Sequence, residues 1–430
     1  MALSTPFPAF FLFASTFCFF LILSSSSLSP ITLPIYHIKK FIRLQMDSES
    51  YALTSLARDE ERLKHLTILP SVGVGQSPSS VVVPLFAESN GEHVVVLRIG
   101  EEKIRTQLLL DTGSSIIWWQ CYPCEKCYNQ RNIPKYNRMS SHSFESIRCS
   151  SNKCDQSQLE ISCSPQGRCL YSINYLDNDT TSGVLAIEEL SSLDGRFSYK
   201  VIFGCGTHNP GKYFLGVYAG ILGFQNLRYS FPTQIRAAKF SFCLITQTEM
   251  STALYLYDFP TPHNKSIVVS LQPRPFYDFS FYYVEFKGIS IHAEMLEVSP
   301  DKWEINLDGS YGVLLDTGTR ITRFPREIYT QFRDKFVEET EDFVPLRVSY
   351  CACYKTNIYY LNYFPEVLLH FTDEKVLRLD PRQVLYEVQT GVYCCICTFG
   401  SITNDDGELS TREDKTFFQF SRSHCDILLQ

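Results

Sequence analysis

The sequence predicts an all-β protein made of two similar lobes with a few short helices, and three observations support this fold class. From Val81 onward, short apolar runs alternate with Gly, Asn, Ser and Pro, which is typical of many short strands. Aromatic residues make up 14% of the chain, and this favours strands over helices. Finally, Leu-Leu-Leu-Asp111-Thr-Gly-Ser recurs 205 residues later as Val-Leu-Leu-Asp316-Thr-Gly-Thr. That separation is the size of one β domain, so each lobe is expected to deliver the same loop.

The clearest helix is expected after Pro325, a residue suited to a first helical turn. Ile328, Phe332 and Phe336 follow at i, i+4 and i+8, so they would share one face. We interpret this helix as scaffold.

The N-terminal region predicts a signal peptide (residues 1–28) and then a propeptide (residues 29–79). The apolar run Ala9–Leu23 is shorter than the ~20 residues of a membrane-spanning helix. No Lys or Arg precedes it, so a membrane anchor stays open as the alternative. The propeptide would hold an amphipathic helix with Leu53, Leu56, Leu63 and Leu66, and a linker at Pro70–Ser80. The N-terminal lobe is expected over residues 80–246 and the C-terminal lobe over residues 247–430.

Charge and cysteine content narrow the class of protein and its compartment. The formal net charge of −7 argues against nucleic acid and against anionic membrane surfaces as partners. Sixteen cysteines indicate an oxidising compartment and a disulfide framework. We therefore expect a secreted protein, outside the cell or in the vacuole, with no stable membrane association. Loss of Cys18 with the signal peptide would leave an odd number of cysteines.

The repeated loops predict a catalytic pair, Asp111 and Asp316. Two carboxylates that share one proton can activate a water molecule and protonate a leaving nitrogen, because their repulsion separates their pKa values. The glycine of each loop allows the backbone to approach the carboxylate, and the nearby hydroxyls can hold it in plane. The supporting residues are Thr112, Gly113, Ser114, Thr317, Gly318 and Thr319. The alternative for one copy is an ordinary Asx turn, and the second copy argues against it.

These motifs resemble the pepsin-like aspartic proteases, and within them the plant nepenthesin-type branch, from about Gly91 to about Phe399. The matching stretches include Asp111-Thr-Gly-Ser-Ser-Ile-Ile-Trp118, Gln120-Cys-Tyr-Pro-Cys124, Phe203-Gly-Cys-Gly206, Gly220-Ile-Leu-Gly223 and Asp316-Thr-Gly-Thr. The resemblance implies a bilobal fold with a cleft between the lobes, an acid-activated propeptide, Trp118 as support and a flap hairpin carrying Tyr175. It also implies polypeptide substrates, a monomer and no cofactor.

The sequence departs from the family pattern at two places. The flap reads Tyr175-Leu-Asp-Asn-Asp179 where relatives carry a glycine-containing segment, and Asn178 there begins a glycosylation sequon, as does Asn264. The second lobe also lacks a counterpart, near the C-terminus, of the strand end Ile221-Leu222-Gly223. We therefore expect a C-terminal lobe that is incomplete at its end, with an unpaired sheet edge and a poorly fixed Asp316.

Cys121, Cys124 and Cys127 have the spacing of metal ligands, but a secretory route and the lack of a nearby His favour disulfides, with no metal. Spacing alone does not select the pairs. The pairs implied by the resemblance are Cys121–Cys124, Cys127–Cys205, Cys149–Cys169, Cys154–Cys163, Cys243–Cys425 and Cys353–Cys394.

Two functions of different classes are compatible with the sequence. The first is an aspartic endopeptidase that hydrolyses peptide bonds at acidic pH. The second is a protease-fold protein that is weakly active or inactive and acts as an inhibitor or binding module. Two complete Asp-Thr-Gly loops favour the enzyme.

Overall fold

The computed structural model describes most of both lobes. The described residues are 31–38, 41, 81–83, 93–242, 251–256, 267–270, 281–398 and 417–420, with short gaps at 159, 176–178, 212–213, 215, 238–239, 306–311, 319–321, 341–342, 344, 348–350, 380 and 390. The predicted signal peptide, the amphipathic helix and linker of the propeptide, and both sequon asparagines lie outside these residues. Among the described residues, no helix has the length and apolar character needed to cross a bilayer.

The first lobe is built on a 13-stranded sheet whose main path runs β13-β14-β1-β3-β4-β12-β5-β11-β10-β9-β8. Its strands are β1 (Ile31–His37), β3 (His93–Ile99), β4 (Ile104–Asp111), β5 (Trp118–Tyr122), β6 (Tyr136–Asn137), β7 (Glu145–Ser146), β8 (Ile161–Cys163), β9 (Cys169–Asn174), β10 (Thr180–Ser191), β11 (Ser198–His208), β12 (Gly220–Gly223), β13 (Phe240–Phe242) and β14 (Ser251–Leu256). Short helix α2 (Phe231–Gln234) follows β12. Two clusters of buried side chains form its core, and in one of them Trp119 stacks on Phe203 with ring centroids 3.7 Å apart.

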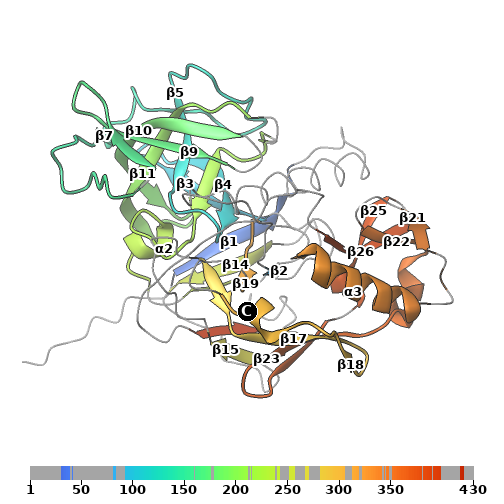
Figure 1. Cartoon of the computed structure of the whole chain (residues 1–430). Coiled ribbons are helices and arrows are strands. Elements are labelled where there is room, and N and C mark those ends of the chain that lie inside the picture. The colour runs from blue at the N-terminus through green and yellow to red at the C-terminus, as the bar shows by residue number, and fades with distance from the viewer. Residues whose placement is uncertain are drawn as a thin grey trace, which may run out of the picture.

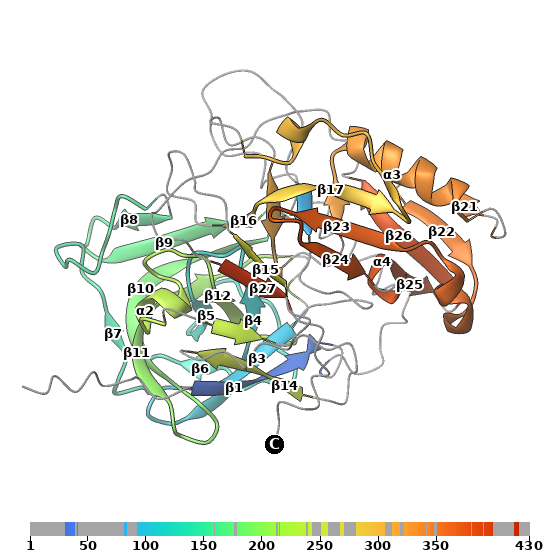
Figure 2. The same ribbon diagram turned by 90° about the horizontal axis from the view of Figure 1, so that it is seen from below.

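The second lobe contains an eight-stranded and a four-stranded sheet. Its strands are β2 (Val81–Val83), β16 (Tyr282–Val284), β17 (Phe286–Ile291), β18 (Glu294–Met295), β19 (Val313–Leu315), β20 (Arg323–Phe324), β21 (Pro345–Arg347), β22 (Cys351–Lys355), β23 (Val367–Phe371), β24 (Val376–Leu379), β25 (Leu385–Gln389) and β26 (Val392–Thr398). A separate pair joins β15 (Ile267–Ser270) to β27 (Phe417–Phe420). The helices are η2 (Pro300–Lys302), α3 (Arg326–Glu338), η3 (Ile358–Tyr363) and α4 (Pro381–Val384). Figures 1 and 2 show the two lobes from perpendicular directions.

The predicted helix is α3, and its face is the expected one. Ile328, Phe332 and Phe336 are each 0% exposed and belong to the core of the second lobe. Pro325 stands one position earlier than predicted, as the residue that precedes the first helical turn. The fold class, all-β and bilobal with few helices, is confirmed.

The first part of the predicted propeptide is a strand of the first lobe. β1 pairs with β14 on one side and with β3 on the other, both antiparallel. Leu33 and Ile35 point into the core and are 0% exposed. β1 therefore connects two parts of the sheet that lack direct pairing with each other.

The edge that the sequence leaves open in the second lobe is filled in the structure. β2 lies between β19 and β20, parallel to β19 and antiparallel to β20. The expectation of an unpaired strand beside Asp316 is therefore wrong, because residues from the N-terminal side of the first lobe occupy that place. In the described part of the chain after residue 398 there is one strand, β27, and it pairs with β15 instead.

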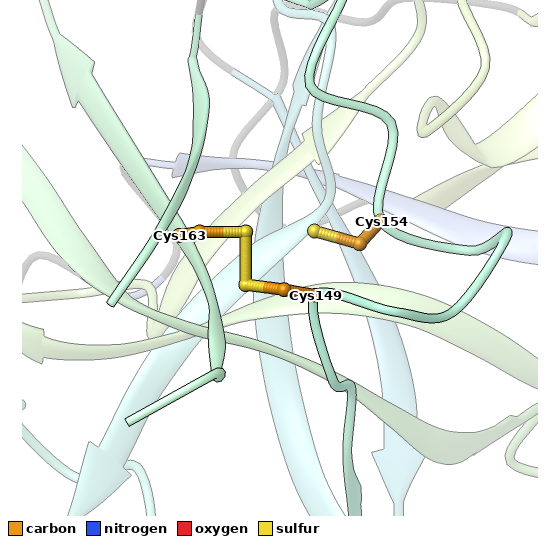
Figure 3. Close-up of side chains that lie close together, drawn as sticks. All are labelled: Cys149, Cys154 and Cys163. Carbon is orange, nitrogen blue, oxygen red and sulfur yellow. A yellow bond between two sulfur atoms is a disulfide. The ribbon is translucent and has the colours of Figure 1, made fainter. Parts of the chain in front are cut away.

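The eight cysteines predicted to form disulfides in the first lobe all do so, but all four predicted pairings are wrong. The observed pairs are Cys121–Cys205, Cys124–Cys127, Cys149–Cys163 and Cys154–Cys169. Several pairings are possible here because the sulfur atoms of Cys149, Cys154 and Cys163 all lie within 4.8 Å of one another. Figure 3 shows these three side chains side by side. All three belong to disulfides, so none is available as a thiolate ligand for a metal.

In the second lobe, Cys353 forms a disulfide, and Cys394 stands opposite it in the register of β22 and β26. The pairing of these two residues remains a prediction. Cys243 and Cys425 lie outside the described residues.

Candidate active site

The first Asp-Thr-Gly loop begins where the buried strand β4 ends. Asp111 is 0% exposed. Its Oδ1 accepts a hydrogen bond from the backbone N–H of Gly113 at 2.9 Å, and its Oδ2 accepts one from the hydroxyl of Ser114. Both oxygens of the carboxylate therefore have a donor within three residues, as the sequence predicts for Ser114. Such local bonds fix the plane of the carboxylate.

The strand β12 holds this loop from the side. It runs parallel to β4 with Gly223 opposite Asp111, and the N–H of Phe224 donates to the backbone carbonyl of Asp111 at 2.8 Å. A Cβ atom at Gly223 would lie 2.7 Å from the carbonyl oxygens of Ser114 and Ile116. Only glycine allows this close approach of two backbones.

The second loop repeats the arrangement of the first. β19 ends at Leu315, and Asp316 follows it with 0% exposure. The N–H of Gly318 donates to Oδ1 of Asp316 at 2.8 Å, the counterpart of the bond made by Gly113. Thr319, the predicted counterpart of Ser114, lies outside the described residues.

Reciprocal hydrogen bonds tie the two loops together. The N–H of Thr112 donates to Oγ1 of Thr317 at 3.0 Å, and the N–H of Thr317 donates to Oγ1 of Thr112 at 2.9 Å. Oγ1 of Thr317 also donates to the carbonyl of Leu110 at 3.0 Å, so the bond network reaches strand β4. Because each hydroxyl serves the opposite lobe, the position of one carboxylate relative to the other depends on both threonines.

We expect Thr317→Val to destabilise the protein by about 1–3 kcal/mol, because it leaves a buried N–H at Thr112 and a buried carbonyl at Leu110 without their partner. The measurement is the free energy of unfolding from a urea titration. Thr317→Ser is the matched control: it keeps the hydroxyl and should lose much less. Equal stability of Thr317→Val and the unaltered chain would show that these bonds do not hold the lobes together.

Tyr175 reaches the first loop through Trp118. The indole N–H of Trp118 donates to the hydroxyl of Tyr175 at 2.6 Å. Burial raises the pKa of Tyr175 well above its usual value, and the nearby Asp111 carboxylate raises it further. The Tyr175 phenol, which lies near Asp111, is therefore neutral. The N–H of Tyr175 also bonds to the carbonyl of Asp179 at 2.8 Å, which closes the hairpin tip between β9 and β10.

Comparisons with known proteins agree with this geometry. Family models described as Xylanase inhibitor N-terminal and Xylanase inhibitor C-terminal match residues 93–256 and 281–407. The chain is 30% identical over 391 residues to Protein ASPARTIC PROTEASE IN GUARD CELL 2 of Arabidopsis thaliana, covering 86% of this chain and 81% of that protein. It is 28% identical over 355 residues to aspartic proteinase nepenthesin-2 of Nepenthes gracilis, covering 79% and 76%. The chain belongs to the pepsin-like aspartic proteases, in their nepenthesin-type plant branch.

A solved structure from soybean has the same fold. The crystal structure of Basic 7S globulin from soybean matches with a TM-score of 0.60 and 15% sequence identity, covering 92% of this chain and 97% of that chain. At this identity, the likeness shows the fold alone.

Beside Asp111, this family member has an aromatic wall, and one of its three residues, Phe214, was not predicted from the sequence. We define it as Trp118, Tyr175 and Phe214. The ring of Phe214 meets Trp118 at 5.4 Å and Tyr175 at 6.2 Å between centroids, both edge to face. Such contacts stabilise a fixed ring arrangement. The available signal was an aromatic residue in a stretch bounded by Gly211 and Gly216, which is too common to single out.

Tyr128 packs against this wall from the cysteine-rich insert, which we define as residues 121–130 with Cys121, Cys124 and Cys127. Its ring lies 4.8 Å from that of Phe214, and its hydroxyl donates to the carbonyl of Tyr218 at 3.1 Å. The insert is fixed at this point because the amide of Gln120 donates to the carbonyl of Tyr128 at 3.1 Å. The Cys124–Cys127 disulfide immediately precedes Tyr128. The insert thus packs against Phe214 of the wall.

Proposed function

We propose that this protein is an aspartic endopeptidase that hydrolyses extended polypeptides at acidic pH. The observation that carries the proposal is the pair of complete, buried Asp-Thr-Gly loops joined by the reciprocal bonds of Thr112 and Thr317. Two carboxylates held by equivalent bonds can divide the roles of base and acid between them. One removes a proton from the attacking water, and the other protonates the nitrogen of the departing amine.

The hairpin that carries Tyr175 is proposed as the flap over the substrate. The hydroxyl of Tyr175 accepts a hydrogen bond from Trp118 and lies near Asp111. A peptide bound beside the carboxylate would therefore contact the tyrosine ring. The sequence departs here from the family, and the stretch after Tyr175 holds Asp179, which is 1% exposed.

We also propose a secreted or vacuolar location, which rests on the apolar N-terminus, on disulfides in the first lobe and on relatives that are plant aspartic proteases.

The rival function is that of an inhibitor or binding protein, because the matching family models are described as xylanase inhibitors. The test is digestion of a denatured protein at about pH 4 by the purified chain, with and without a pepstatin-type inhibitor. Inhibitor-sensitive cleavage supports the enzyme. The absence of any cleavage from a folded sample, with its disulfides formed, would favour the binding protein.

Tyr128 should influence which side chains the enzyme accepts, because its ring packs against that of Phe214. We expect Tyr128→Ala to raise KM about tenfold for peptides with a large apolar side chain at the cleaved bond, with a smaller change in kcat. Peptides with alanine there should be affected much less. The matched control is Tyr122→Ala, since Tyr122 belongs to the same insert and is 52% exposed. Equal losses for all peptides would indicate a general folding defect and contradict the specific role.

A further inference from the structure

The strand β2 occupies a position that matters for the second catalytic loop. Its register with β19 is parallel, with Val81 opposite Val313 and Val83 opposite Leu315. On its other side, Val82 stands opposite Arg323 of β20 in antiparallel register. β19 leads directly into Asp316, and β20 follows the same loop. The three residues of β2 therefore lie between the two strands that enter and leave the loop.

The first lobe has the same arrangement around Asp111. There, β12 lies between β4 and β5, parallel to the strand that enters the loop and antiparallel to the strand that leaves it. The next strand outward is parallel in both lobes: β11 beside β5, and β26 beside β20. The spatial order β4-β12-β5-β11 thus corresponds to β19-β2-β20-β26, and neighbouring strands run in the same relative directions in both sets.

The role of β12 indicates what a strand in this position does. Its register extends to Gly223 opposite Asp111, and the next two residues continue the contact. Phe224 donates its N–H to the carbonyl of Asp111 at 2.8 Å, and Gln225 donates to the carbonyl of Ser114 at 3.0 Å. These bonds fix the backbone on which the carboxylate stands. A loop without such a strand would keep only its internal turn and the bonds that join it to the other loop.

We infer that Val81–Val83 is the positioning strand of the second catalytic loop, provided by the segment that connects β1 to β3 of the first lobe. In the part of the chain that the structure describes, no other strand lies between β19 and β20. The strand of Phe417–Phe420 pairs with β15 and takes no part in this sheet. β2 ends opposite Leu315, one residue before Asp316, whereas β12 reaches Asp111 itself.

The inference has a structural part, which is independent of activity, and a part concerning Asp316, which rests on the proposed function. The structural part is tested by hydrogen exchange of the full chain, followed by mass spectrometry. Val82→Pro removes a ladder donor and should raise exchange at least about tenfold in Val313–Leu315 and Arg323–Phe324. Leu108–Leu110 in the first lobe should remain unchanged. Val82→Thr is the conservative control, because it keeps the N–H and the β-branched shape.

A second measurement keeps the inference testable if Val82→Pro fails to fold. A benzophenone amino acid at position 82 of the full chain should cross-link, on illumination, to residues of β19 or β20. Cross-links to the first lobe alone, or unchanged exchange around Leu314 in folded Val82→Pro, would overturn it.

Activity then separates the inference from the proposed function. In an active enzyme, Val82→Pro should lower kcat on the order of 100-fold with little change in KM, since small displacements of a catalytic group have effects of this size. Val82→Thr, the conservative control, should keep the kcat of the unaltered chain. A chain without any turnover, but with the expected exchange and cross-links, would refute the protease and leave the positioning strand established. An active Val82→Pro variant with normal kcat would refute the role of β2 in positioning Asp316.

Discussion

Asp111→Asn and Asp316→Asn should each reduce peptide hydrolysis at least about 100-fold while leaving the fold intact. Each change removes one member of a pair that shares a proton, so either the base or the acid is lost. Asparagine keeps the oxygen that accepts from Gly113 or Gly318, so the loop bonds persist. The measurements are initial rates on a denatured substrate near pH 4 and the midpoint of thermal unfolding.

The matched control is Asp373→Asn, a change of the same chemistry at an exposed site in the second lobe. This variant should keep full activity. If Asp111→Asn or Asp316→Asn retained more than a few per cent of the rate, the assignment of the catalytic pair would be wrong. If both lost activity together with a large drop in the unfolding temperature, the carboxylates would be structural as well as catalytic.

The second large effect concerns β1. A chain that begins at Val81 should be poorly soluble and much less stable than the full chain, although it keeps β2. Without β1, strands β3 and β14 each lose the partner on one side, and two unpaired sheet edges result. Leu33 and Ile35 are fully buried, and burial of each contributes about 1.5–3 kcal/mol. These losses are a large share of the about 5–15 kcal/mol that stabilises a typical protein.

The control for this prediction is the full chain cut after it has folded, by a protease acting between residues 42 and 80. The cut chain should keep its unfolding temperature, and the peptide containing β1 should stay bound through gel filtration. A chain starting at Val81 that proves as stable and soluble as the full chain would show that another segment can replace β1. It would also restore the whole of residues 29–79 as a removable propeptide.

The sequence allowed the two Asp-Thr-Gly loops to be predicted because their signal is local. Asp-Thr-Gly after an apolar run specifies a strand end and a turn within seven residues, and the repeat gives the second copy. The helix α3 was predictable for the same reason, since Ile328, Phe332 and Phe336 define its face within three turns.

Features that depend on pairing between distant residues could not be predicted in this way. The disulfide pattern depends on the folded positions of Cys149, Cys154 and Cys163, whose sulfur atoms are close enough for more than one pairing. The strand β2 is only a run of three valines after a linker, and nothing near it in the sequence specifies β19 as its partner. Contacts of this kind are decided by three-dimensional closure rather than by local propensity.

The origin of β2 also sets the order in which the protein can be completed during synthesis. Val83 leaves the ribosome roughly 230 residues before its partner Leu315, a delay on the order of 10–50 seconds at about 5–20 residues per second. During that time the first lobe can assemble around β1 and β3, while β2 has to stay unpaired until β19 and β20 are made. Among the described strands, the place between β19 and β20 is filled by β2, so closure of this sheet uses a segment made long before the rest of it. Although the chain resembles two copies of one domain, a strand made before most of the first lobe joins the sheet of the second.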